Sequence, residues 1–222
     1  AMGKRALRQN STGANNTAMG HNALAANTTA SNNTATGYGA LYLNTTGANN
    51  TASGYQALYN NTTGAGNTAL GRNALLGNST GNYNICVGYN SDSTTGTASG
   101  QCTLGDVNIT NLRCNDTSIS SLSDQRDKAE IIDSPYGLDF INTVKPRQFK
   151  WETRDGNAKD GMTRLGFISQ ELLESCDGKN DVLDLVLDDN LDKLEAKYGN
   201  LLPIMVQAIK ELSAKVEALE NA

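Results

Sequence analysis

A serine and a lysine stand five positions apart in the segment Ser123-Asp124-Gln125-Arg126-Asp127-Lys128. A lysine can replace histidine as the general base for a serine nucleophile when it is held neutral, so the pair predicts acyl chemistry of the Ser-Lys type. Positions five apart lie on different faces of a straight helix, so Ser123 must precede the helical turn that leads to Lys128. The ordinary alternative is a helix start with a solvated charge, in which Asp124 is the N-cap.

Three further motifs follow the pair in order. They run from Tyr136 to Ile141, from Lys145 to Trp151 and from Leu165 to Glu171. Together with Ser123, Asp124, Arg126, Lys128 and Ile131, they resemble the self-cleaving intramolecular chaperone domain at the end of phage tail spikes and tail fibres. The resemblance covers residues 123–222 and implies a homotrimer that assembles in the host cytoplasm and functions in the virion.

The resemblance also implies a reaction. The Ser123 hydroxyl would attack the carbonyl of Leu122 while Lys128 takes its proton, and water would hydrolyse the resulting ester. Asp127 stands where many relatives have leucine, and a carboxylate there would favour the charged lysine. Asp124, Arg126, Gln170 and Glu171 are candidates for support, and the sequence leaves open whether Gln170 and Glu171 serve chemistry or packing.

The elements that must position this pair are expected to form an α+β domain. We expect helices over residues 127–132, 137–144 and 170–175, and paired strands over 147–151 and 165–168. The C-terminal helix carries an apolar heptad seam, which predicts helix partners. The seam consists of Leu202, Met205, Ile209, Leu212, Val216 and Leu219. Its residue types would by rule favour two strands, so the expectation of three chains comes from the resemblance.

The N-terminal part is a repeat array of 17 residues per unit, with one glycine in each from Gly3 to Gly105. The repeated unit Asn-Thr-Ala-x-Gly-x-x-Ala-Leu predicts a β-solenoid, with room for two short strands and two turns per coil. The unit resembles the head repeats of trimeric autotransporter adhesins, which form a β-roll. We expect the β-roll array over residues 1–90, a connector with short strands over 91–122 and the chaperone domain over 123–222.

The net charge and the small core of the array indicate which kinds of partner it has. Residues 1–100 carry a net charge of +3 and the remainder carries −8. A coil that buries mainly one alanine and one leucine is a thin core for a single chain, so we expect an obligate oligomer. The acidic balance disfavours nucleic-acid binding. The sequence contains no apolar run of membrane length.

The remaining candidate groups predict no metal or cofactor site. Cys86, Cys102, Cys114 and Cys176 have no zinc-ligand spacing, and they are expected to be reduced, with a contact between Cys86 and Cys102 as the alternative. The single histidine, His21, is expected to be an exposed turn residue.

The leading hypothesis is a tail-fibre or tail-spike fragment that continues upstream and binds a host receptor which the sequence does not identify. Its alternatives are a non-cleaving trimeric adhesin and a solenoid that binds ice or polysaccharide through threonine ladders. The two ladders, which could equally be buried turn bonding, are Thr17, Thr34, Thr51, Thr68 and Thr12, Thr29, Thr46, Thr63, Thr80.

Overall fold

The computed structural model describes residues 1–106, 108–109, 123–150, 163–192 and 194–222. The chain divides into two compact units, Ala1–Asn111 and Leu112–Ala222.

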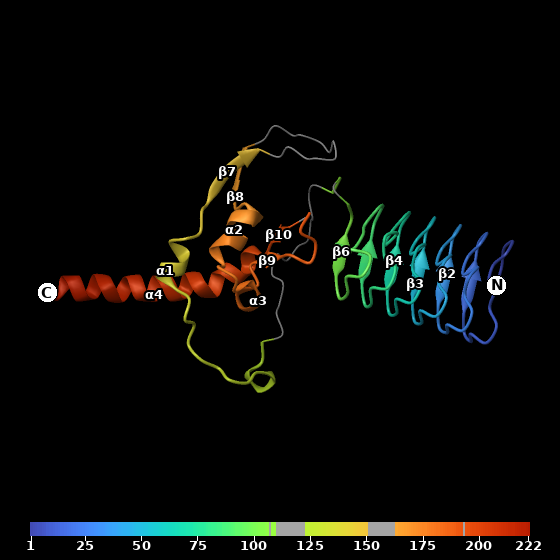
Figure 1. The fold of residues 1–222 in the computed structure, drawn as a ribbon, viewed down its shortest axis with the longest axis horizontal. Helices are drawn as coiled ribbons and strands as arrows, with labels where there is room; N and C mark the ends of the chain where they lie inside the picture. Colours follow the sequence, from blue (N-terminus) through green and yellow to red (C-terminus); the bar gives the residue numbers. More distant parts are fainter. Residues whose placement is uncertain (107, 110–122, 151–162, 193) are drawn as a thin grey trace, which may run out of the picture. The chain divides into compact units, whose positions relative to one another are not determined.

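The N-terminal unit is a β-solenoid whose coils each add one short strand to a six-stranded parallel sheet (Figure 1). Successive strands pair in the order of the sequence, so that Ala18 faces Ala35 and Ala35 faces Ala52. The strands are β1 (Thr17–Met19), β2 (Thr34–Thr36), β3 (Thr51–Ser53), β4 (Thr68–Leu70), β5 (Ile85–Val87) and β6 (Cys102–Leu104). The predicted solenoid is therefore confirmed.

Each coil from β1 to β4 buries the middle residue of its strand and an Ala-Leu pair on its opposite side. Ala52, Ala57 and Leu58, for example, are fully buried. The opposite side is a turn and not the second strand that we expected. The reason is its backbone: Gln56 and Leu58 have positive φ of 53° and 54°, which no β-strand accommodates. Coil-to-coil hydrogen bonds persist there, as from Leu58 N to Ala74 O.

Buried asparagines form a second continuous set of contacts through the solenoid. Each amide of one column donates to the amide of the preceding coil, as from Asn61 Nδ2 to Asn44 Oδ1 at 2.8 Å and from Asn78 Nδ2 to Asn61 Oδ1 at 2.9 Å. Burying these polar groups is acceptable because every coil supplies the partner for the next. This column comprises Asn10, Asn27, Asn44, Asn61 and Asn78.

The sheet continues beyond residue 90, where we expected the array to end. Ile85 of β5 pairs with Cys102 of β6, which keeps the spacing of 17 residues although the Asn-Thr-Ala consensus is lost. Gln101 N donates to Asn84 Oδ1, the side chain of the preceding coil. The strands expected within residues 107–122 lie largely outside the described residues, and the remaining domain boundaries stay predictions.

The C-terminal unit is an α+β arrangement of short elements on one long helix. In order these are η1 (Gln125–Asp127), α1 (Leu138–Ile141), β7 (Arg147–Lys150), β8 (Thr163–Gly166), α2 (Ser169–Ser175), α3 (Asn180–Leu183), β9 (Val186–Leu187), β10 (Glu195–Ala196), η2 (Tyr198–Asn200) and α4 (Leu201–Glu220). Strands β7 and β8 form an antiparallel pair, as do β9 and β10.

The expected helix over 127–132 is wrong. The 3-10 turn η1 ends at Asp127, and no helix follows it there, because Lys128 is extended and Glu130 has a positive φ of 52°. The other expected helices and strands occur within a few residues of the predicted bounds, although α1 is shorter and β8 begins earlier.

Helix α4 presents two apolar faces. Leu201, Ile204 and Ala208 are buried. Leu201 and Ile204 belong to a core that also includes Leu172, Leu183 and Leu185. Helix α1 packs against α4 (Figure 1). The second apolar face of α4 has no partner within the described residues.

Candidate active site

The 3-10 turn η1 brings the serine and the lysine together. Lys128 follows η1, and its backbone N–H donates to Gln125 O at 3.1 Å. This bend returns the lysine side chain toward Ser123, and Lys128 Nζ donates to Ser123 Oγ at 2.5 Å. Ser123 therefore precedes the turn that leads to Lys128, which is the arrangement that the spacing of the two residues requires.

Asp124 holds the turn in place. It is the N-cap of η1 and accepts a hydrogen bond from Arg126 N at 2.9 Å. The Arg126 side chain also donates to both carboxylate oxygens, at 3.0 Å and 2.5 Å. These contacts lower the pKa of the Asp124 carboxyl below its usual range. The carboxylate is thus engaged by Arg126 and caps the turn.

The site is open to solvent in a single chain. Ser123 and Lys128 are both exposed. Leu122, which would supply the acyl half of the bond, lies outside the described residues, as does the side chain of Asp127.

The two later motif residues lie in helix α2. Glu171 accepts from Arg147 Nε at 2.7 Å and pairs with its terminal nitrogen at 2.5 Å, which joins β7 to α2. The Arg147 guanidinium lowers the pKa of the Glu171 carboxyl. Gln170 is exposed. Among the described contacts neither residue touches Ser123 or Lys128.

Glu211 connects helix α4 to the start of helix α1, a contact that the sequence motifs did not predict. Its carboxylate accepts from Leu138 N at 2.8 Å and from Gln207 Nε2 at 3.0 Å. The Leu138 N–H is the main cause of its lowered pKa. A Cβ on Gly137 would lie 2.2 Å from Glu211 Oε1, so a larger residue there would shift this carboxylate. Glu211 occupies a polar position between seam residues, so the heptad pattern alone gave no signal for it.

The predicted seam is exposed along α4. Ile209 is 64% and Leu219 is 78% accessible. Leu202, Met205, Leu212 and Val216 are exposed as well. A row of large apolar side chains of this length is uncommon on a solvent-facing helix and is typical of an interaction face.

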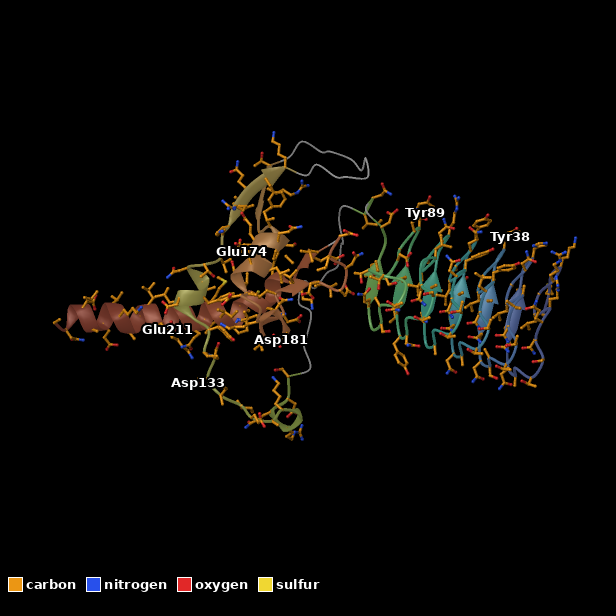
Figure 2. All side chains as sticks on the ribbon, in the orientation of Figure 1. Tyr38, Tyr89, Asp133, Glu174, Asp181 and Glu211 are labelled. Atoms are coloured by element: carbon orange, nitrogen blue, oxygen red, sulfur yellow. The ribbon has the colours of Figure 1, made fainter. Side chains whose placement is uncertain are left out.

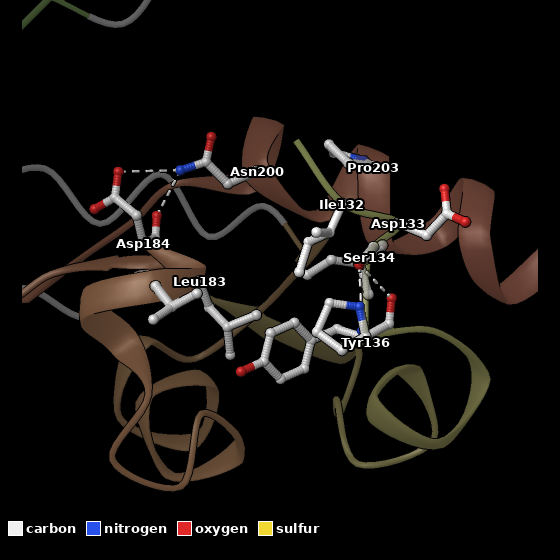
Figure 3. Close-up of a pocket in the computed structure, with 11 residues that line it drawn as sticks. Ile132, Asp133, Ser134, Tyr136, Leu183, Asp184, Asn200 and Pro203 are labelled. Atoms are coloured by element: carbon white, nitrogen blue, oxygen red, sulfur yellow. Dashed lines mark hydrogen bonds between the residues drawn. The ribbon is translucent and has the colours of Figure 1, made fainter. Parts of the chain in front are cut away.

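An apolar groove of about 490 Å³ lies between residues 132–136 and helices α3 and α4 (Figure 3). Asn200 Nδ2 donates to Asp184 O at 2.6 Å on one side, and Ser134 Oγ donates to Tyr136 O at 2.9 Å on the other. Ile132 at its edge is 80% exposed. The groove includes neither residue of the Ser-Lys pair.

The described cysteines carry free thiols, and the single histidine lies in an aromatic stack. Cys86, Cys102 and Cys176 are free, and burial raises the pKa of the Cys86 thiol to about 11. Cys86 points into the solenoid whereas Cys102 is exposed, and Cys114 lies outside the described residues. His21 is half-buried and stacks on Tyr38, which corrects the expectation of an exposed residue.

The threonine ladders do not show the buried turn bonding that was the alternative to a binding role. Thr34 and Thr51 lie on the outward face of the sheet, and Thr46 and Thr63 are exposed at the turns. The threonines that bond between coils are their neighbours, as from Thr45 Oγ1 to Thr62 O at 3.0 Å.

The chain thus joins a β-solenoid to an α+β unit in which Lys128 contacts Ser123. Residues 123–183 match the family described as chaperone of endosialidase. This match and the β-solenoid fit a tail spike or tail fibre with a C-terminal chaperone domain, which confirms the predicted resemblance. This family supports a role in trimer assembly and, in general terms, autoprotease activity. No curated protein and no solved structure matches the chain significantly. Within the part of the chain that the structure describes, no helix is both long and apolar enough to span a bilayer.

Proposed function

We propose that this chain is a segment of a phage tail fibre or tail spike whose C-terminal domain guides homotrimer assembly and then releases itself by cutting the Leu122-Ser123 bond. The observation that carries the proposal is the 2.5 Å contact between Lys128 Nζ and Ser123 Oγ. The family match begins at Ser123, which supports a junction at this position. The protein would be a single-turnover serine autoprotease without an external substrate or cofactor.

The reaction requires only these two side chains and one water molecule. Neutral Lys128 accepts the hydroxyl proton of Ser123 as Oγ bonds to the carbonyl carbon of Leu122. The C–N bond to Ser123 breaks, and the lysine returns the proton to the departing Ser123 amine. Water then hydrolyses the ester, which leaves a carboxylate on Leu122 and restores the Ser123 hydroxyl.

We expect this reaction to depend on assembly, because Lys128 is solvated in one chain. Packing of neighbouring chains would exclude water from the site and favour the neutral amine. The exposed seam of α4 offers the surface through which three parallel chains would associate. Cleavage would then report a completed trimer and make the assembly irreversible, so that its stability becomes kinetic.

Mass spectrometry of the denatured protein tests the proposed reaction. The wild-type chain should yield a fragment that begins at Ser123. Ser123→Ala should abolish that fragment, and Lys128→Ala should slow its formation by roughly 10²-fold or more, as expected for loss of a general base. The exposed Lys150 provides the matched control, because Lys150→Ala removes the same charge elsewhere. A fragment that starts at position 123 in the Ser123→Ala variant would rule out the assigned nucleophile.

The second candidate is a trimeric adhesin in which the pair is inert. The exposed seam of α4 supports association in both cases. The two functions differ in one measurement, since an adhesin without cleavage stays a single full-length chain on a denaturing gel.

A further inference from the structure

One edge of the solenoid carries an unbroken ladder of stacked aromatic and guanidinium groups. Its members, His21, Tyr38, Tyr55, Arg72 and Tyr89, each follow a turn glycine at intervals of 17 residues. The rings of His21, Tyr38 and Tyr55 stack with successive centroids 5.2 Å apart. The Arg72 guanidinium lies 5.7 Å from the Tyr55 ring centre and 5.5 Å from that of Tyr89.

The backbone fixes this ladder in place. The preceding glycines have left-handed φ, and a Cβ on Gly54 would lie 2.3 Å from the carbonyl oxygen of Gly71. The coils are therefore stacked as closely as a glycine allows, and the side chains that follow are held in register. Figure 2 shows Tyr38 and Tyr89 along the same edge of the solenoid.

The ladder presents ring edges and hydroxyl groups to solvent. Tyr38, Tyr55 and Tyr89 are about half exposed because their neighbours cover the ring faces. A second stack is formed by Tyr42 and Tyr59, whose ring centroids are 4.9 Å apart. It lies near the ladder, because a Cβ on Gly39, the residue after Tyr38, would be 3.2 Å from the Tyr59 ring. Phenol hydroxyls in a row can both donate and accept hydrogen bonds.

Arg72 is the charged group of the ladder. Two tyrosine rings hold its plane, and it makes no ion pair with any residue that the structure describes. A guanidinium held in this way keeps its N–H edge available for a planar or tetrahedral anion. Asp92, the only acid among residues 1–100, accepts from Gly77 N and Ser93 N.

Amide side chains line the neighbouring column. Asn73 Nδ2 donates to Asn90 Oδ1 at 3.0 Å, and Asn73 Oδ1 is buried without a hydrogen-bond partner among the described residues. Gln56 belongs to the same column, one coil before Asn73. Amide and phenol groups beside a single cation match the hydroxyls and the acidic group of a sugar, whereas a peptide ligand would also need apolar side-chain pockets.

We propose that this ladder binds a linear anionic polysaccharide that runs along the solenoid, with an acidic group on Arg72 and sugar hydroxyls on the tyrosine hydroxyls and amides. A linear polymer fits because the groups of the ladder follow one another in a straight row, one per coil, about 4.8 Å apart. The inference deepens the proposed function, since it assumes that the fibre attaches to a host surface and names the class of receptor.

Binding of the full-length protein to immobilised polymers tests the proposal. Polygalacturonate supplies carboxylates and dextran sulfate supplies sulfates, so the two distinguish the sources of the anion. Dextran is the neutral control and polyglutamate is the acidic peptide. We expect binding to at least one anionic polysaccharide, with little binding to dextran or polyglutamate. Arg72→Gln should weaken it about tenfold or more, because a hydrogen bond to a charged group is lost.

Arg8→Gln is the matched variant, since it removes the same charge from the first coil and should bind as the wild type does. If Arg72→Gln does not fold, Arg72→Lys takes its place and should also bind more weakly, because an ammonium lacks the planar fork. Absence of binding to both anionic polysaccharides, equal binding to dextran or polyglutamate, or unchanged affinity of the Arg72 variant would overturn the proposal. Self-cleavage followed in the same samples tests the proposed function separately.

Discussion

Replacing Asn61 with alanine should destabilise the solenoid strongly although it removes only a small polar side chain. Asn61 is fully buried, donates to Asn44 Oδ1 and Gly64 O, and accepts from Asn78 Nδ2. After the change Asn44 Oδ1 loses its only described partner, at about 1–3 kcal/mol for a buried unsatisfied acceptor. The other two bonds contribute about 0.5–1.5 kcal/mol each. The expected cost is therefore about 2–6 kcal/mol.

Hydrogen exchange of peptides from the coils around Asn61 measures this cost locally. A loss of about 2 kcal/mol should accelerate exchange roughly thirtyfold where opening limits protection. Thr63→Ala is the control, because Thr63 is exposed in the same turn and its side chain forms no hydrogen bond with a described residue. Its effect should stay within about 0.5 kcal/mol. Equal exchange in the two variants would refute the view that the asparagine column stabilises the coils.

Two further predictions concern the C-terminal unit. Replacing Ile209 and Leu212 together by aspartate should prevent trimer formation, and therefore cleavage, because like charges would converge in an apolar seam. Light scattering measures the oligomeric state and denaturing gels measure cleavage. Efficient cleavage by a monomeric, folded variant would exclude the dependence on assembly. Acid should destabilise this unit, because the pKa values of Glu171 and Glu211 are lower in the folded chain than in the unfolded chain. The stability that the two carboxylates contribute is fully present above the ordinary glutamate pKa of about 4.3 and is lost as the pH falls through their lowered pKa values. Thermal melts from neutral pH to pH about 3 should show this loss, and Glu211→Gln should make the melting temperature less dependent on pH.

The sequence predicts the solenoid well because its contacts repeat. Each coil has the same partners as the next, so one glycine, one Ala-Leu pair and one asparagine per period determine the register. The turn on the side of Leu58 was not foreseen, since leucine rarely adopts a left-handed backbone and only the stacking of neighbouring coils imposes it.

The candidate site was partly predictable for a related reason. Ser123 and Lys128 are close in sequence, so local geometry could anticipate their contact, and the structure adds the 3-10 turn that accomplishes it. The contact between Leu138 N and Glu211 joins residues 73 positions apart. No local pattern encodes such a pairing, because it depends on how α1 packs against α4.

The constant register of the coils makes each repeat a unit of length. Adding or removing 17 residues between two turn glycines would change the span of the solenoid by one strand spacing, about 4.8 Å, and would recreate every contact at the junction. An insertion of any other size would shift the inward alanines and the buried asparagines out of line. Duplication or loss of whole repeats therefore offers a route by which such a fibre can adjust its reach without redesigning its core.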